Sequence, residues 1–151
     1  MADSDRPPPY LLQAEAYPFS TEVRTRYADL DPYKHINNVA VAAIYEEGRA
    51  GFLRWMMARG ENIERVGRLV AELRIRYLAQ ILYPNTLQVT AGITHLGRTS
   101  FRFSQGLFLD GRCMGICDTV MVHSDGQRPV EISPAWRATF DNAWVRQPAS
   151  G

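Results

Sequence analysis

The sequence predicts an α+β domain in which one long helix packs across a single antiparallel sheet. Apolar residues recur at three- and four-residue steps between positions 39 and 59, which is the period of a helix. On either side of that segment they alternate with polar residues, which is the period of a half-buried strand. Because the helix is not interleaved with the later strands, the pattern favours an α+β fold over a parallel α/β fold.

The first strand is predicted over residues 19–27, where Phe, Thr, Val, Thr and Tyr occupy the odd positions. A short turn follows it, rich in acids and asparagines. Asp31 in this turn precedes Pro32, which holds Asp31 away from helical backbone geometry.

The long helix is predicted from about residue 39 to residue 59, with Asn37 or Asn38 as its N-cap and Gly60 as its end. Its polar residues form only a narrow strip, so most of its surface is expected to be enclosed. The residues of its main apolar stripe are Val41, Ile44, Tyr45, Gly48, Phe52, Trp55 and Met56.

Further strands are predicted over residues 69–77, 86–95, 100–109 and 112–123. The dipeptide Asp110-Gly111 is a strong hairpin signal before the last of them. Residues 129–134 are expected to be extended, and a short helix or arm is expected from Ala135.

The chain length predicts a single domain, over residues 18–146, between a flexible N-terminal arm of residues 1–17 and a frayed tail of residues 147–151. An antiparallel sheet with a helix on one face leaves strand edges and an outer face to be covered. We therefore expect a homodimer or homotetramer, formed by pairing of edge strands or helices.

Composition argues against several functions. The chain is 46% hydrophobic and 22% charged, and its net charge of +1 does not favour nucleic-acid binding. No apolar run is long enough to span a membrane, because charged residues interrupt the helical segment. The N-terminus lacks the basic-then-apolar pattern of a secretory signal, so a cytoplasmic location is expected.

The two cysteines, Cys113 and Cys117, do not have the number or spacing of zinc ligands. On a strand their spacing would place both on one face, as small core residues. They are expected to be reduced thiols, which fits a cytoplasmic protein.

The turn before the helix carries the chemistry of this chain. A carboxylate held beside a helix start can activate water or attack an electrophile itself. The unpaired N–H groups of the first helical turn can bind a developing oxyanion. Asp-Pro is also common in ordinary turns, so Asp31 needs its surrounding residues to indicate a catalytic role.

Five segments together match the pattern of a known family. They are Tyr27-Ala28-Asp29-Leu30-Asp31-Pro32, His35-Ile36-Asn37-Asn38-Val39, Tyr45-Glu46-Glu47-Gly48-Arg49, Tyr77-Leu78 and Gly97-Arg98-Thr99-Ser100-Phe101. On these segments the chain resembles the hotdog-fold thioesterases, in particular the branch that contains 4-hydroxybenzoyl-CoA thioesterase and bacterial acyl-CoA thioesterases. The resemblance implies a long central helix wrapped by a curved antiparallel β-sheet.

The resemblance also implies hydrolysis of acyl-CoA thioesters to free acid and CoA, with no metal or organic cofactor. It places the catalytic carboxylate at Asp31, as general base or nucleophile, and the oxyanion donor at the backbone N–H of Asn38, with Val39 beside it. His35 can orient Asp31, contact the substrate or hold the loop, and these alternatives stay open. Tyr33 stands where plant acyl-ACP thioesterases carry an asparagine, so the chain departs from their Asp-Asn-His arrangement.

Another branch of the fold places its catalytic acid on the helix, which makes Glu46 or Glu47 the rival of Asp31. Glu46 and Arg49 are three positions apart, and an ion pair is the expected arrangement for them.

The acyl group is expected to lie against the helix stripe and the inward strand residues, with Tyr45, Phe52 and Phe101 as candidates. CoA is anionic, so basic residues are expected along its approach. The candidates are Arg98, Arg102, Arg74 and Arg76. The expected partners are an acyl-CoA substrate and further copies of this chain.

Two other functions compete with hydrolysis. A hotdog hydratase or dehydratase acting on 3-hydroxyacyl thioesters would use an Asp and a His, but neither Asp31 nor Asp29 has the matching distance from His35 in sequence. A non-catalytic protein that binds acyl thioesters would not need an acid beside a helix start.

Overall fold

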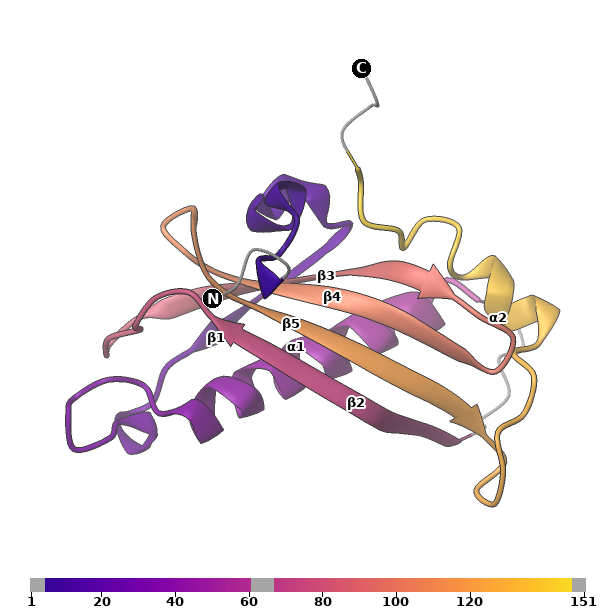
Figure 1. The fold of residues 1–151 in the computed structure, drawn as a ribbon, viewed down its shortest axis with the longest axis horizontal. Coiled ribbons are helices and arrows are strands. Elements are labelled where there is room, and N and C mark those ends of the chain that lie inside the picture. Colours follow the sequence, from indigo (N-terminus) through magenta and orange to yellow (C-terminus); the bar gives the residue numbers. More distant parts are fainter. Residues whose placement is uncertain (1–4, 61–66, 148–151) are drawn as a thin grey trace.

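The computed structural model describes residues 5–60 and 67–147. Its sheet is antiparallel, with strand order β1-β3-β4-β5-β2, and α1 lies across one face (Figure 1). The elements are β1 (Phe19–Arg24), α1 (Asn38–Met57), β2 (Gly67–Tyr77), β3 (Thr86–Leu96), β4 (Ser100–Leu109), β5 (Arg112–Ser124) and α2 (Pro134–Ala138). The predicted α+β arrangement is confirmed.

The start of α1 is determined by Asn37. Its side-chain oxygen accepts a hydrogen bond from the Ala40 N–H at 2.8 Å, which pairs one of the open donors of the first turn. At the other end, the Gly60 N–H donates to the Met57 carbonyl at 3.2 Å. The predicted helix therefore forms, but it ends at Met57 and not at residue 59.

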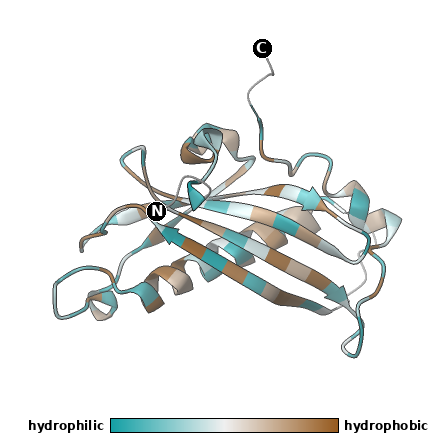
Figure 2. Ribbon diagram, viewed as in Figure 1, coloured by the Kyte–Doolittle hydropathy of each residue, from teal (hydrophilic) through white to brown (hydrophobic). Residues whose placement is uncertain are grey.

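The inner face of the sheet and α1 enclose two apolar clusters. One lies near the start of α1 and includes Tyr45 and Leu107; the other lies near its end and includes Phe52 and Phe101. Figure 2 shows the alternation of hydrophobic and hydrophilic residues along the strands that places one set of side chains in this core. Burial of each large apolar side chain contributes roughly 1.5–3 kcal/mol, so these clusters are the main source of stability.

The outer face of the sheet is partly covered by the N-terminal segment. Two 3₁₀ turns, Pro9–Leu12 and Ala14–Ala16, pack Leu11 and Tyr17 against Phe108, and the Tyr17 hydroxyl donates to the Leu11 carbonyl at 2.8 Å. The sequence pattern predicts a loose arm over residues 1–17, and that prediction is wrong for this part of it. Its apolar side chains have no helical or strand period, but they pack against the outer face of the sheet.

The two cysteines do not share a face as predicted. The register of β4 and β5 shifts between Leu107 and Phe108, so that one extra residue is inserted before Gly115. As a result Cys117 lies in the inner core and half-buried Cys113 packs with the outer cluster. Burial raises the pKa of the Cys117 thiol to about 11, which makes it unreactive at neutral pH.

The short helix expected near Ala135 is α2, and it is capped by Ser133. Its Trp136, together with Phe140, packs into the second core cluster. The predicted frayed tail begins at residue 147, and its residues 148–151 lie outside the described part of the chain. In residues 5–60 and 67–147 no helix has both the length and the apolar character needed to cross a bilayer.

Candidate active site

The loop between β1 and α1 is folded around the carboxylate of Asp31. Its Oδ1 accepts the backbone N–H groups of Tyr33 at 2.9 Å and His35 at 3.0 Å. The Asp31 N–H in turn donates to the His35 carbonyl at 2.9 Å, and Lys34 closes the turn with a positive φ of 64°. Asp31 therefore shapes the turn with one oxygen, while Oδ2 makes no hydrogen bond within the described residues.

The neighbouring acid, Asp29, has a structural role, as expected from the sequence. It is buried and forms an ion pair with Arg26 at 2.7 Å, and it also accepts the Arg26 backbone N–H at 2.8 Å. The hydrogen bond from the Arg26 guanidinium holds the pKa of Asp29 below its ordinary value. Its backbone carbonyl accepts both the N–H and the side-chain amide of Asn37, at 2.9 and 2.8 Å. Asp29 thus ties the loop to the helix cap.

The helix start beside this loop has open donors. The Ala40 N–H is paired with the Asn37 side chain, and the Val41 N–H with the Asn37 carbonyl at 3.0 Å. The backbone N–H groups of Asn38 and Val39 have no hydrogen-bond acceptor within residues 5–60 and 67–147. They carry the positive end of the helix dipole and point out of the first turn.

A cavity of about 350 Å³ brings Asp31, His35 and Asn38 together. Most of the other residues that line it are apolar, and they come from the loop before α1, from α1, β4 and β5, and from the end of β2 with the segment that follows. These residues are Ile36, Val41, Tyr77, Leu78, Ala79, Gln80, Ile81, Leu107, Met114 and Gly115. A second hollow at the same helix start is lined by Asp31, Asn38 and Val39 among others. The sequence-predicted catalytic residues therefore share one site.

His35 meets Asp31 only through its backbone. The hydrogen bond runs from the His35 N–H to the carboxylate, and no hydrogen bond joins the imidazole to Asp31 within the described chain. His35 is half-buried and is one of the residues that line the cavity.

The aromatic candidates for acyl contact separate into two groups. Tyr45 is fully buried in the cluster that backs the cavity. Phe52 and Phe101 are not brought to this cavity, because they lie further along α1 and β4 in the second core cluster. There Phe52 packs on Phe103 with ring centroids 5.6 Å apart.

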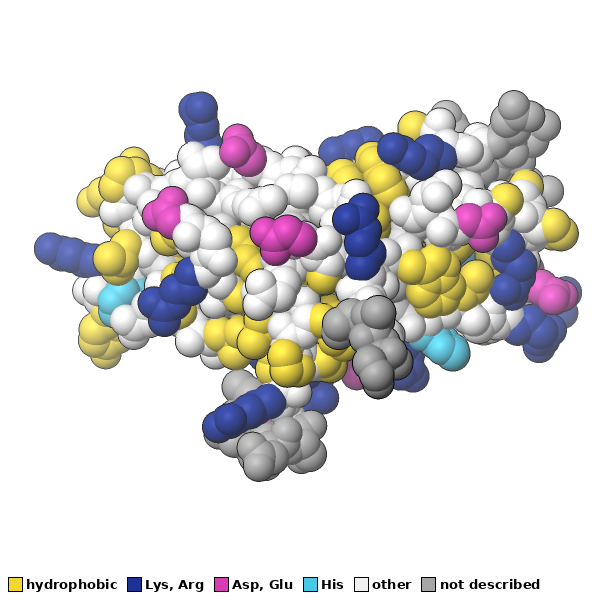
Figure 3. All heavy atoms as spheres, turned by 90° about the horizontal axis from the view of Figure 1, so that it is seen from above, with side chains coloured by type: hydrophobic (Ala, Val, Ile, Leu, Met, Phe, Trp, Pro, Cys, Tyr) yellow, Lys and Arg dark blue, Asp and Glu magenta, His cyan; other side chains and the backbone are white. Residues whose placement is uncertain are grey.

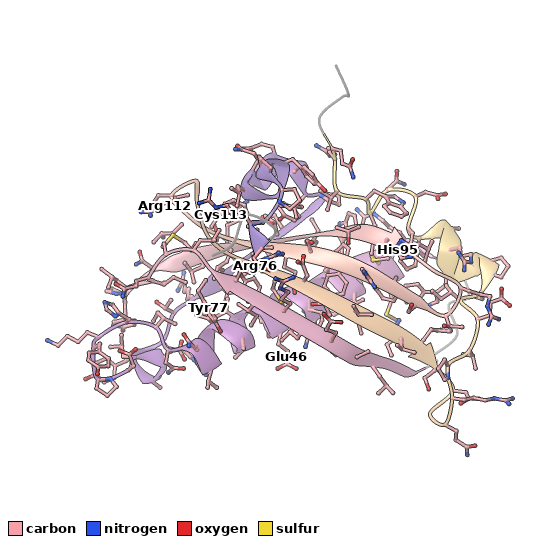
Figure 4. The ribbon with its side chains drawn as sticks, viewed as in Figure 1. Glu46, Arg76, Tyr77, His95, Arg112 and Cys113 are labelled. Atoms are coloured by element: carbon pink, nitrogen blue, oxygen red, sulfur yellow. The ribbon has the colours of Figure 1, made fainter. Side chains whose placement is uncertain are left out.

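The candidate basic residues also do not line the cavity of this chain. Arg102, Arg74 and Arg76 line a hollow on the outer face of the sheet. Arg74 is paired with Asp5 at 2.5 Å, and Arg76 is paired with Asp118. Figure 4 shows Arg76 and Tyr77 on β2 near the cavity end of the sheet. Figure 3 shows basic and acidic side chains mixed over one face of the molecule.

Arg98 belongs to the β3–β4 turn at the opposite end of the sheet. Its carbonyl accepts the Ile132 N–H at 2.9 Å, and the neighbouring Thr99 carbonyl accepts the His123 N–H at 2.8 Å. Within one chain this turn and the Asp31 loop lie at different ends of the strands.

The rival acid on the helix is not part of the cavity. Glu46 is paired with Arg49 at 3.4 Å, and its side chain is 72% exposed (labelled in Figure 4). With Glu47 it borders a separate hollow on the β1 side of α1. This arrangement agrees with the predicted ion pair.

Sequence reasoning missed the wall contributed by residues 77–81 and by Met114 and Gly115. Of these residues, only Tyr77 and Leu78 could have been found from the sequence, because they form one of the segments that carry the family resemblance. No group of three or more metal-binding side chains occurs in the described ranges.

A long helix wrapped by a curved antiparallel sheet is the hotdog fold, and in this chain an acid lies beside the helix start. Residues 25–140 match the sequence profile of the thioesterase-like superfamily. The chain therefore belongs to this superfamily. No curated protein matches it by sequence.

Solved structures support the same fold. The PA5185 protein of Pseudomonas aeruginosa PAO1 is 24% identical with a TM-score of 0.76, over 89% of this chain and 98% of that one. A thioesterase of Thermus thermophilus, solved with coenzyme A and Zn, is 26% identical with a TM-score of 0.72, over 83% and 98%. YbaW of Escherichia coli, a probable thioesterase, is 22% identical with a TM-score of 0.67, over 84% and 98%.

Proposed function

We propose that the chain hydrolyses acyl-CoA thioesters, with Asp31 as general base or nucleophile and the helix-start N–H groups as the oxyanion hole. The observation that carries this proposal is the common cavity of Asp31 and Asn38. Membership of the thioesterase-like superfamily supports thioester hydrolysis, and the CoA-bound Thermus relative supports CoA as the thiol.

The two carboxylate oxygens of Asp31 have different roles, and this suits Asp31 to catalysis. Oδ1 is held by two backbone N–H groups, which fixes the carboxylate without using Oδ2. Oδ2 can accept a proton from water or attack the thioester carbon, and the two mechanisms use the same geometry. The N–H groups of Asn38 and Val39 then stabilise the negative oxygen of the tetrahedral intermediate.

The imidazole of His35 is assigned to substrate contact. His35 lines the cavity, and its ring makes no hydrogen bond to Asp31 in the part of the chain described, so an orienting role has no geometric support. The apolar wall formed by Val41, Leu107 and Met114 is suited to the acyl group.

The assembly we propose is a homodimer joined through β2. This strand is at the edge of the sheet, and its Leu69, Val70, Leu73 and Tyr77 are large apolar residues left exposed. Two copies of one strand pair antiparallel about a two-fold axis, which places Gly67 of one copy near Tyr77 of the other. The Arg98 turn of the second copy would then approach the cavity of the first, where it can meet the CoA phosphates.

The test is a thiol-release assay over a panel of acyl-CoAs with the wild type and Asp31→Asn. We expect release from the wild type and a loss of about 10²–10⁴-fold in the variant, the range for a general acid or base. Normal turnover by Asp31→Asn would refute the assignment. Saturable binding without thiol release would indicate a binding protein, and water addition to an enoyl thioester would indicate a hydratase.

A further inference from the structure

A buried hydroxyl without a partner lies beside the cavity wall. Tyr45 is fully buried, and within the described chain its Oη forms no hydrogen bond. The Oη lies against Gly115, which belongs to the wall: a Cβ atom on Gly115 would be 2.9 Å from it. The missing side chain at Gly115 is what leaves room for the hydroxyl at this point.

Tyr45 stands on α1 behind the part of the cavity wall that Gly115 forms. Asn38 and Tyr45 are seven positions apart, roughly 10 Å along the helix axis. Val41 lies between them and also lines the cavity. Helical side chains lean toward the N-terminus, so the Tyr45 ring is directed back toward the Asn38 end. An acyl group whose carbonyl meets the Asn38 N–H would extend past Val41 toward Gly115, and the Tyr45 Oη lies directly behind Gly115.

A second polar atom in this part of the core also lacks a partner. Gln105 is fully buried, and its Nε2 donates to the Tyr45 carbonyl at 3.0 Å, but its Oε1 accepts no hydrogen bond in the described residues. Buried polar atoms without partners cost free energy and are few in native proteins. Burial raises the pKa of Tyr45 well above its ordinary value, so the phenol stays protonated and can donate.

We propose that Tyr45 selects acyl groups that carry a hydroxyl near their far end, which pairs with the Tyr45 Oη. This inference rests on the proposed acyl-CoA hydrolysis. A neutral hydroxyl fits because it both donates and accepts. A carboxylate does not fit, since the surrounding wall of Ile81, Leu107 and Met114 is apolar and would leave the charge desolvated.

The experiment compares linear acyl-CoAs of increasing length, each as the unsubstituted and the ω-hydroxy form, and measures kcat/KM by thiol release. For the wild type we expect the hydroxy form to be preferred by about tenfold at the chain length that reaches Tyr45, as for one added hydrogen bond. In Tyr45→Phe the preference should fall to near one.

Tyr17→Phe is the matched control, because it removes the hydroxyl of a buried tyrosine on the other face of the sheet. It should retain the wild-type preference. Thermal unfolding without substrate distinguishes the two variants further. Tyr45→Phe should not lower Tm. Tyr17→Phe loses a 2.8 Å hydrogen bond and should therefore lower Tm. An equal rate for both forms in the wild type, or a preference that survives in Tyr45→Phe, overturns the proposal while acyl-CoA hydrolysis stands. Absence of thiol release from every substrate overturns both.

Discussion

The Oδ1 atom of Asp31 lies 3.0 Å from the backbone nitrogen of His35 and accepts its N–H. This bond closes the loop that carries both residues to the cavity. The proposed catalytic group is therefore also the residue around which its loop folds, and the two roles can be separated by substitution.

Asp31→Ala and Asp31→Asn should differ in stability and agree in activity. Asparagine retains an oxygen that can accept the Tyr33 and His35 N–H groups, whereas alanine leaves both unpaired. We expect Asp31→Ala to lose about 1–2 kcal/mol of unfolding free energy and Asp31→Asn much less, by denaturant unfolding. Both should lose thiol release. Equal stability of the two variants would show that the loop does not depend on the carboxylate.

Asp29 should give the protein a stability that depends on pH. Its pKa is lowered in the folded state by the Arg26 guanidinium, so the ionised form stabilises the fold above the unfolded-state pKa of about 4. That contribution is lost as pH falls through the lower, folded-state pKa. Asp29→Asn should be less stable than wild type by about 1–2 kcal/mol at pH 7, and the difference should shrink in acid. Thermal unfolding across pH measures it.

The control for removing one negative charge is Glu22→Gln, an exposed acid on β1. If the difference in stability between Asp29→Asn and the wild type stayed constant as the pH fell, the ion pair with Arg26 would not be the cause of the lower stability.

Asn37→Ala should destabilise the start of α1. It removes the cap on the Ala40 N–H and the bond to the Asp29 carbonyl, so we expect a loss of about 1–2 kcal/mol. Asn37→Ser is the comparison, because serine can cap the helix but cannot replace the hydrogen bond from the Asn37 side-chain amide to the Asp29 carbonyl. Because the open N–H groups of Asn38 and Val39 are positioned by this cap, thiol release should fall in proportion to the loss of helix order. Unchanged unfolding of Asn37→Ala would contradict this account.

Leu69→Lys should separate the proposed dimer without unfolding the chain. Leu69 is 58% exposed on the edge strand β2, so a lysine there is tolerated in one chain but would bury a charge in the apolar interface between two copies. Sedimentation should show a shift from dimer to monomer. Leu82→Lys is the matched control, since Leu82 is 54% exposed but lies outside β2. A dimer that survives Leu69→Lys would exclude this edge.

Gly115→Ala should be destabilising through Tyr45. The new Cβ would be 2.9 Å from the Tyr45 Oη and 3.0 Å from the Arg76 carbonyl oxygen, so the chain must shift, at a cost of about 1–3 kcal/mol. Removing the hydroxyl in the double variant Gly115→Ala/Tyr45→Phe should recover part of this loss. Denaturant unfolding of the four proteins gives the coupling energy. Strictly additive effects would show that the two groups do not touch.

Much of the fold could be predicted from local pattern. The long helix and the later strands form where the apolar period changes, and Asn37 was one of two predicted caps. The cysteines show the limit of this reasoning: a single-residue register shift before Gly115 sends Cys113 to the other face. A shift of this kind is decided by packing between strands, which no local period encodes.

For the candidate site, the sequence by itself determined the segment with the proposed catalytic residues, because Asp31, His35 and Asn38 are neighbours in the chain and one turn brings them together. Only the tertiary structure decided the rest of the cavity wall. Gly115 and Tyr77 come from distant strands, Phe52 and Phe101 face another cluster, and the Tyr45 hydroxyl is left without a partner among the described residues. The physical reason is that short-range turns follow from local residue types, whereas a pocket depends on how separate elements meet.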